Sequence, residues 1–299
     1  MKSKWATKLA IWLGTIIFLT ALAIIIWQTV SGGSQSTESL KWLQLLQTIG
    51  TFLLPPVLCA WIWDEHHTPF RWLGLRSSAN WQTIVLATLA MVCAIPAINL
   101  LADLNSRVEL PKSLEFIEQI LKAQEEAAAE LTERFLAADN LLTLLLNIGL
   151  LALLPALAEE LSFRGTLQQI ISPVSGPSQG TVSVRTHVAI WVTAFIFSAV
   201  HLQFYGFVPR MLMGAMFGYV FVWTGSLWVP MVMHFTNNGI AVLAYYLIGP
   251  EGQEKSWADT IGAGSTWWLG VISLIGVCCL LYWIRVRGLQ GYARRIRKQ

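Results

Sequence analysis

Charged residues are scarce in this sequence. Only 12% of its 299 residues are Asp, Glu, Lys or Arg, whereas 55% are hydrophobic. A soluble globular chain carries about 25% charged residues, roughly twice this share. The composition therefore predicts an integral membrane protein, and it excludes disordered chains, collagens and soluble nucleic-acid-binding proteins.

Cysteine is also rare. The chain has four cysteines, each inside an apolar run and none in a CxxC pair: Cys59, Cys93, Cys278 and Cys279. We interpret them as small buried hydrophobic residues. This pattern excludes a secreted disulfide scaffold and a cysteine-ligated zinc site.

Long apolar runs dominate what is present. Eight runs are long enough to cross, or nearly cross, about 30 Å of hydrocarbon. They cover roughly residues 9–30, 43–63, 81–101, 141–171, 186–205, 209–224, 227–248 and 266–284. The expected fold class is all-α, a polytopic membrane helical bundle of about eight transmembrane helices.

Basic residues predict the orientation of this bundle. With an even number of spans and the N-terminus inside, the inner segments hold 13 of the 20 Lys and Arg residues. The positive-inside rule therefore places both termini in the cytoplasm. The basic tail after residue 284 is expected to contact lipid headgroups and no nucleic acid.

One stretch, residues 111–138, is rich in glutamate and has apolar residues at helical spacing. It predicts an amphipathic helix outside the membrane, either a solvated connection or a lid over a substrate site. We divide the chain into N-terminal transmembrane helices with this acidic helix (1–138), a catalytic core (139–250), and a last transmembrane helix with the basic tail (251–299).

Charged side chains within the fourth span indicate function. A charge at a helix centre costs about 2.5–3.5 kcal/mol even on lenient insertion scales. Glu160 and Arg164 are four residues apart and can form an ion pair. Glu159 lies about 100° around the helix from Glu160 and has no local partner. Pro155, one turn earlier, is expected to open the helix backbone there.

Two later spans add polar residues. The fifth span carries His201, and the seventh carries His234 and Asn238, which share one helix face because they are four residues apart. The sixth span is only about 23 Å long, which would raise its turn into the membrane and help the three sites to converge. A single hydrated cavity between the helices explains all of these residues together.

This set of residues supports two mechanisms of hydrolysis. In the first, Glu159 acts as a general base on water, His201 assists, and His234 and Asn238 donate hydrogen bonds to an oxyanion. In the second, Glu159, His201 and His234 ligate Zn²⁺ and leave one position open. The HExxH spacing is absent, so the sequence leaves both mechanisms open.

Three motifs carry a resemblance. Glu159-Glu160-x-x-x-Arg164, Phe197-x-x-x-His201 and His234-x-x-x-Asn238 occur in order on successive late spans. They resemble the motifs of the CPBP family, which includes type II (Rce1-like) CAAX prenyl endopeptidases and the Abi group.

The resemblance implies an intramembrane endopeptidase acting on peptide or protein substrates at the membrane, some of them CAAX-prenylated. It further implies catalytic roles for Glu159, His201, His234 and Asn238, with Glu160 and Arg164 in support. Members are often classed as metalloproteases, which keeps zinc as a possible cofactor.

Two other functions compete with the protease. A non-catalytic scaffold or immunity protein could bind a partner in the same cavity, but a binder has no need of an unpaired buried carboxylate. A proton-coupled transporter could use Glu159 and His201 as a relay. The sequence shows no repeat relating its halves, which argues against a transporter. Substrate identity and oligomeric state cannot be deduced from the sequence.

Overall fold

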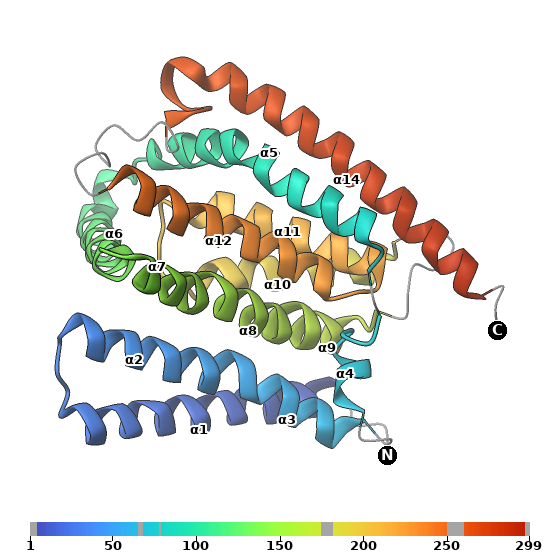
Figure 1. The fold of residues 1–299 in the computed structure, drawn as a ribbon, viewed down its shortest axis with the longest axis horizontal. Coiled ribbons are helices and arrows are strands. Elements are labelled where there is room, and N and C mark those ends of the chain that lie inside the picture. The colour runs from blue at the N-terminus through green and yellow to red at the C-terminus, as the bar shows by residue number, and fades with distance from the viewer. Residues whose placement is uncertain (1–4, 65–67, 78, 175–181, 250–259, 297–299) are drawn as a thin grey trace.

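The structure is a computed structural model that describes residues 5–64, 68–77, 79–174, 182–249 and 260–296. Helices joined by turns make up this part of the chain, which contains no strand. Most of the helices run roughly along one common direction and form a bundle (Figure 1). The prediction of an all-α polytopic bundle is confirmed.

The first half of the chain supplies three long helical rods and the outer helix. Its elements are α1 (Trp5–Ser31), α2 (Thr37–Gln47), the π-helix η1 (Thr48–Leu53), α3 (Leu54–Trp63), α4 (Pro69–Trp72), α5 (Trp81–Ser106), η2 (Lys112–Leu114) and α6 (Glu115–Leu136). Because α2, η1 and α3 follow one another without a break, they form a single rod from Thr37 to Trp63.

The second half begins with another continuous rod. Its elements are α7 (Leu141–Asn147), the π-helix η3 (Ile148–Leu153), α8 (Leu154–Ser162), the π-helix η4 (Phe163–Gln168), α9 (Gln169–Ile171), α10 (Val184–Ala199), α11 (Phe207–Thr224), α12 (Trp228–Ile248), η6 (Gly264–Thr266) and α14 (Trp267–Ile296). The rod from α7 to α9 has the same limits as the predicted fourth span.

Among the residues that the structure describes, six helical segments are long and apolar enough to cross a membrane, so the chain is an integral membrane protein. The predicted fifth span is shorter than expected: α10 ends at Ala199 rather than at Tyr205, because the chain turns there and Leu202 takes a positive φ of 55°. The predicted seventh span is α12, with 21 residues. This helix is long enough to cross a membrane, but its polar residues lower its mean hydropathy below that of the six candidate spans.

Helix packing places the second-half rod at the centre. The α8 segment contacts η1 on one side and α12 on the other, α10 packs on α11, and α5 packs on α14. In Figure 1, α1 begins and α14 ends at the same end of the bundle, and α6 lies at the opposite end. The cytoplasmic location of both termini stays a prediction.

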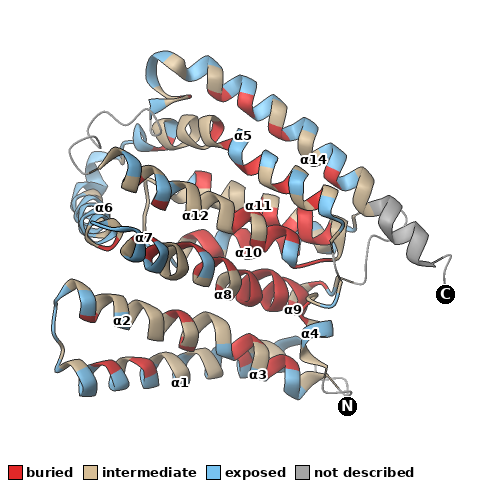
Figure 2. Ribbon diagram, viewed as in Figure 1, coloured by how far each residue is buried: buried red, intermediate tan, exposed pale blue. Residues whose placement is uncertain are grey.

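Burial follows this arrangement. Buried positions gather on α8, η4 and α9, whereas α1 and α14 carry many exposed positions (Figure 2). Large apolar side chains such as Phe18 and Ile275 are more than half exposed on these outer helices. We interpret these exposed side chains as facing lipid, because a bilayer solvates apolar surface that water does not.

The acidic helix α6 joins two distant turns at its end of the bundle. Arg134 donates a hydrogen bond to the carbonyl of Gln35 between α1 and α2, at 3.0 Å. Nearer the start of α6, Glu125 accepts a hydrogen bond of 3.4 Å from the backbone N–H of Tyr205, between α10 and α11. The helix is as predicted; its function, as connection or lid, stays a prediction.

A proline explains one of the links between rods. Pro56 has no N–H, so the carbonyl of Phe52 cannot form the usual helical bond to it. Ser162 of α8 donates its hydroxyl hydrogen to that carbonyl at 2.9 Å. The π-helix η1 ends at Leu53, three residues before this proline. The freed carbonyl thus becomes a contact between α8 and the N-terminal rod.

Candidate active site

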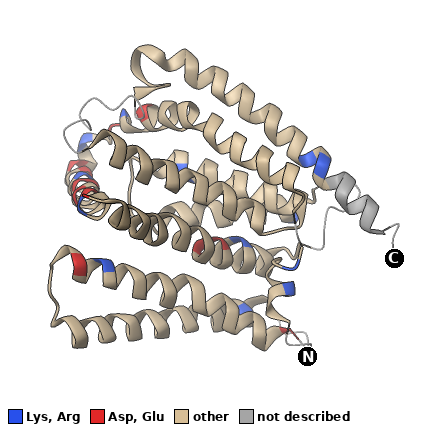
Figure 3. Ribbon diagram, viewed as in Figure 1, with Lys and Arg blue, Asp and Glu red and all other residues tan. Residues whose placement is uncertain are grey.

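A fully buried ion pair lies at the centre of the rod from α7 to α9. Arg164 Nη1 donates to Glu160 Oε1 at 2.7 Å, and both side chains have no exposed surface. Figure 3 shows charged positions of both signs in α8 and the segment after it, within an otherwise uncharged part of the bundle. The ion pair predicted from the four-residue spacing is present.

The backbone carbonyls of two glycines on α11 accept hydrogen bonds from side chains of η4. Arg164 Nη2 donates to the carbonyl of Gly214 at 2.8 Å, and Gln168 Nε2 donates to the carbonyl of Gly218 at 3.3 Å. A Cβ at position 214 would lie 3.1 Å from Arg164 Nη2, and one at position 218 would lie 2.8 Å from Gln168 Oε1. The side chains reach the α11 backbone because no Cβ stands in between.

Aromatic rings surround the buried guanidinium. The Cζ atom of Arg164 lies 4.6 Å from the ring centre of Phe197 and 5.3 Å from that of Phe217. Such cation–π contacts are worth about 2 kcal/mol or more when the cation is desolvated. They offset part of the cost of burying this charge.

His234 links the two carboxylates of the first motif. Its Nδ1 lies 3.0 Å from Glu160 Oε1, and its Nε2 lies 3.9 Å from Glu159 Oε2. Glu160 also accepts from Arg164, so it acts as a carboxylate and the His234 Nδ1 donates the hydrogen. The ring stacks on Phe217 at 5.6 Å. The predicted meeting of the fourth and seventh spans is confirmed.

The two glutamates differ in their surroundings. The side chain of Glu160 has no exposed surface, whereas that of Glu159 is 15% exposed. Glu160 forms hydrogen bonds with Arg164 and His234. Glu159 lies near His234, but their atoms are 3.9 Å apart, too far for a hydrogen bond. Glu159 is therefore the carboxylate that water or a substrate can reach.

His201 lies just beyond the end of α10. Its Nδ1 is 2.7 Å from the carbonyl of Phe197, and because a carbonyl can only accept, Nδ1 donates. In the neutral ring, Nε2 is then an acceptor. The Phe197 ring contacts both His201, at 5.1 Å, and His234, at 6.1 Å. The structure thus joins His201 to the cluster through Phe197.

Asn238 lies one turn beyond His234 on α12. Its Nδ2 donates to the carbonyl of Leu151 in η3 at 3.3 Å. Pro155, four residues after Leu151, has no N–H and leaves this carbonyl without its usual helical donor. The expected opening of the backbone at Pro155 therefore supplies the acceptor for Asn238. The second hydrogen on Nδ2 stays available to another acceptor.

Sequence analysis missed Arg210, in the first turns of α11. It lies within electrostatic range of Glu159 and His201. The only sequence signal is a single charged residue inside an apolar span, which also fits a residue at the membrane interface. Sequence analysis likewise gave no role to Gly214 or Gly218.

Zinc ligation was tested against the positions of the nitrogen and oxygen donors. No three His, Cys, Asp or Glu side chains group closely enough to hold a metal ion within the described residues. Nδ1 of His234 and Nδ1 of His201 are both used in hydrogen bonds, so each Nε2 is the nitrogen that a metal ion could bind, but these two nitrogens and Glu159 do not form such a group. Because the donors do not fit a zinc site as they stand, we derive no step through zinc, and zinc dependence stays a prediction.

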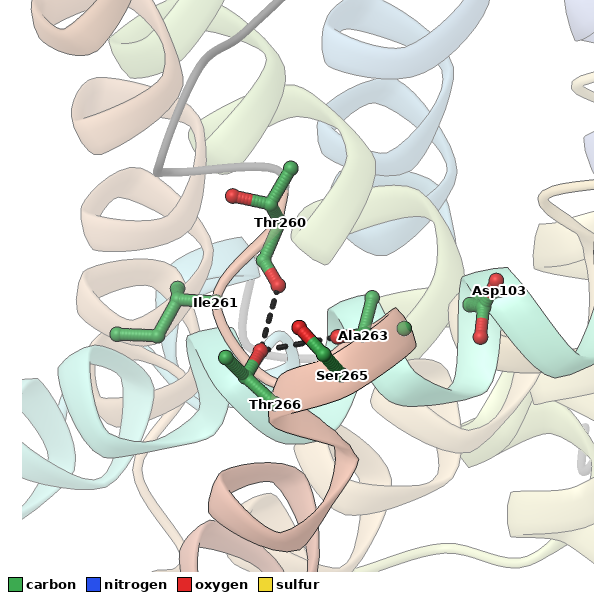
Figure 4. Close-up of a pocket in the computed structure, with 7 residues that line it drawn as sticks. Asp103, Thr260, Ile261, Ala263, Ser265 and Thr266 are labelled. Atoms are coloured by element: carbon green, nitrogen blue, oxygen red, sulfur yellow. Dashed lines mark hydrogen bonds between the residues drawn. The ribbon is translucent and has the colours of Figure 1, made fainter.

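The cavity drawn in Figure 4 lies elsewhere. It has a volume of 580 Å³ and lies between Asp103 of α5 and the turn from Thr260 to Thr266 that leads into α14. The Thr266 hydroxyl is hydrogen-bonded to the carbonyls of Thr260 and Ala263 within that turn. None of the seven motif residues lines this cavity, so we assign it no part in the chemistry.

Comparisons with known proteins match the part of the chain that holds this cluster. Residues 141–240 match the family described as "Type II CAAX prenyl endopeptidase Rce1-like". All seven motif residues, from Glu159 to Asn238, fall within this segment.

Two bacterial relatives match as well. The uncharacterized protein YpbD of Bacillus subtilis strain 168 is 33% identical over 98 residues, which are 31% of this chain and 43% of YpbD. The membrane-embedded CAAX protease MroQ of Staphylococcus aureus strain USA300 is 31% identical over 110 residues, 36% of this chain and 42% of MroQ.

The matches are partial. This chain spans less than half the length of both relatives. No solved structure matches the chain. The family match covers the helices and the turn that carry Glu159, His201 and His234. Residues 141–240 thus match the Rce1-like family of type II CAAX prenyl endopeptidases, and this match supports the resemblance that the three motifs carry.

Proposed function

We propose that this protein is an intramembrane endopeptidase that hydrolyses peptide bonds of membrane-associated substrates with a water activated by Glu159. The observation that carries this proposal is the position of His234 between the two carboxylates. One carboxylate, Glu160, is fixed by Arg164, and the other, Glu159, is the more exposed. A cluster that served only to stabilise the fold would need Glu160 but not Glu159.

Glu159 is the base in this mechanism. It takes a proton from water while the water oxygen attacks the carbonyl carbon of the peptide bond. When the C–N bond breaks, the same carboxyl group returns the proton to the leaving amine. The acceptor Nε2 of His201 can hold the water in place, because Nδ1 is already bonded to the carbonyl of Phe197. No covalent intermediate is required.

His234 and Asn238 stabilise the oxyanion that forms at the attacked carbonyl. Glu160 keeps one ring proton of His234 on Nδ1, so His234 donates from Nε2 only when the ring carries both protons. Asn238 contributes the Nδ2 hydrogen that Leu151 does not use. Loss of one such donor typically costs about 2.7–4 kcal/mol of transition-state stabilisation.

Cleavage by the purified protein in lipid vesicles tests the proposal. The probes are fluorogenic peptides anchored to the vesicle, with and without a prenylated cysteine near the C-terminus. MroQ is named a CAAX protease, which makes the prenylated form one candidate substrate. We propose peptide bonds near such an anchor as the substrate class.

The variant pair Glu159→Gln and Glu130→Gln gives this test its control. Both replace a carboxylate by an amide of the same shape, but Glu130 is exposed on α6. Loss of a general base lowers the rate by about 10²–10⁴-fold. We expect this loss for Glu159→Gln with an unchanged melting temperature in detergent, and no change for Glu130→Gln. A Glu159→Gln protein that cleaves at the wild-type rate would contradict the role of Glu159 as the base, and a wild-type protein that cleaves none of the peptides would favour the scaffold function.

A further inference from the structure

The two hydrogen bonds from the rod to α11 fix the depth of Arg210. Arg164 and Gln168 are one turn apart, and so are their acceptors, Gly214 and Gly218. The two segments therefore run side by side in the same direction. Position 210, one turn before Gly214, lies at the level of position 160. Arg210 is thus a partly buried residue at the depth of the catalytic carboxylate.

The guanidinium of Arg210 has a free donor. Its Nη2 donates to Gln203 Oε1 at 2.6 Å. It packs on Gly206, where a Cβ would lie 2.9 Å from Nη2. Its Nη1 is buried and has no hydrogen-bond partner within the described residues. A buried guanidinium hydrogen without an acceptor is unfavourable, which indicates that a ligand supplies one.

Arg210 is also a cation that lies near two different acids. It lies within electrostatic range of Glu159 and of Glu125 on α6. Neither carboxylate forms an ion pair with it in the described structure, whereas the pair of Glu160 and Arg164 is fully formed. The guanidinium therefore offsets the negative charge around Glu159 while keeping donors available.

We propose that Arg210 binds a carboxylate of the peptide substrate close to the scissile bond. This inference rests on the proposed function. A guanidinium matches a carboxylate with two parallel hydrogen bonds. Without Arg210, a substrate carboxylate at this depth would be repelled by Glu159 and gain no compensating contact. Arg210 thereby selects substrates that carry a negative charge beside the cleaved bond.

Two groups on a peptide offer this chemistry: the C-terminal carboxylate and the side chain of Asp or Glu. The test therefore uses four vesicle-anchored peptides of otherwise equal sequence. They combine a free or amidated C-terminus with Glu or Gln beside the scissile bond. Kinetics are measured for wild type, Arg210→Gln, Arg210→Lys and the control Arg107→Gln, which removes an exposed arginine paired with Asp103 on α5.

We expect wild type to prefer a carboxylate peptide by about 10- to 100-fold, mainly through KM, the range for one charge-assisted hydrogen bond. Arg210→Gln should lose this preference, Arg210→Lys should keep part of it, and Arg107→Gln should keep all of it. Glu125→Gln should strengthen the preference, because it removes a competing carboxylate. Whichever peptide loses its advantage in Arg210→Gln identifies the source of the carboxylate.

The outcomes separate this inference from the proposed function. Cleavage of all four peptides at equal rates by wild type overturns the carboxylate site and leaves the protease in place. If wild type cleaves none of them, the affinity of the same peptides is measured for the single variant Glu159→Gln and for the double variant that also carries Arg210→Gln. This comparison tests the carboxylate site without cleavage. Equal affinity for acid and amide forms in the first protein overturns the inference.

Discussion

The side-chain amide of Asn238 donates a hydrogen bond to the backbone carbonyl of Leu151, at 3.3 Å. The two residues lie on different helices, α12 and the π-helix η3. Pro155 makes the contact possible, because it leaves the Leu151 carbonyl without a helical donor. The third motif is thus fixed to the first through a proline that belongs to neither.

Pro155→Ala should uncouple Asn238 from the rod. Alanine restores an N–H that can bond to Leu151 and compete with Asn238 for the same carbonyl, which weakens the contact. We expect a loss of activity of several-fold to tenfold, the size of one hydrogen bond of about 0.5–1.5 kcal/mol, without a lower melting temperature. Pro96→Ala in α5 is the matched control and should retain activity. Equal activity of both variants would contradict this function of Pro155.

Helical periodicity predicted several details that the structure confirms. The spacing of Glu160 and Arg164 along one helix predicted their ion pair, and the apolar run from 141 to 171 predicted the central rod. These features are local, because residues four apart on a helix are neighbours whatever surrounds them. The premature end of α10 was missed, because its sequence remains apolar through Val200 and the turn after it depends on contacts with other helices.

Contacts between distant segments explain what the sequence could not predict. His234 and Glu160 are separated by 74 residues, and their contact depends on how α12 packs on α8. Glycine is common in membrane helices, so the sequence alone does not distinguish Gly214 and Gly218. Their function is visible only from the side chains that donate hydrogen bonds to their carbonyls. The place of Arg210 follows only from that packing.

Gly214→Ala and Gly218→Ala should destabilise the protein. The added Cβ would lie 3.1 Å from Arg164 Nη2 in the first variant and 2.8 Å from Gln168 Oε1 in the second. Overpacking costs about 1–3 kcal/mol, more than the roughly 1 kcal/mol that alanine gains in a helix. Gly276→Ala on α14 is the control, because nothing lies within 4 Å of its Cβ position. Melting in detergent should rank Gly218→Ala lowest, and an unchanged melting temperature for both would refute the packing argument.

Glu160→Gln and Arg164→Ala should lower both stability and activity. Removing one partner of a buried ion pair costs about 3–5 kcal/mol. Activity should fall as well, because Glu160 also holds Nδ1 of His234. Melting curves and cleavage rates check both parts. Glu159→Gln serves as the comparison, with lost cleavage and intact stability. Equal destabilisation of all three variants would contradict the separate functions of the two glutamates.

Metal analysis distinguishes the two mechanisms of water activation. Two ligands about 2.0–2.1 Å from a tetrahedral zinc ion lie roughly 3.3 Å apart, whereas His234 Nε2 and Glu159 Oε2 are 3.9 Å apart. We therefore expect less than stoichiometric zinc in the purified protein, and cleavage that survives a chelator but not Glu159→Gln. Stoichiometric zinc with chelator-sensitive cleavage would contradict direct base catalysis. In that case Glu159, His201 and His234 would be the residues that hold the metal ion, and the ion would supply the activation of water.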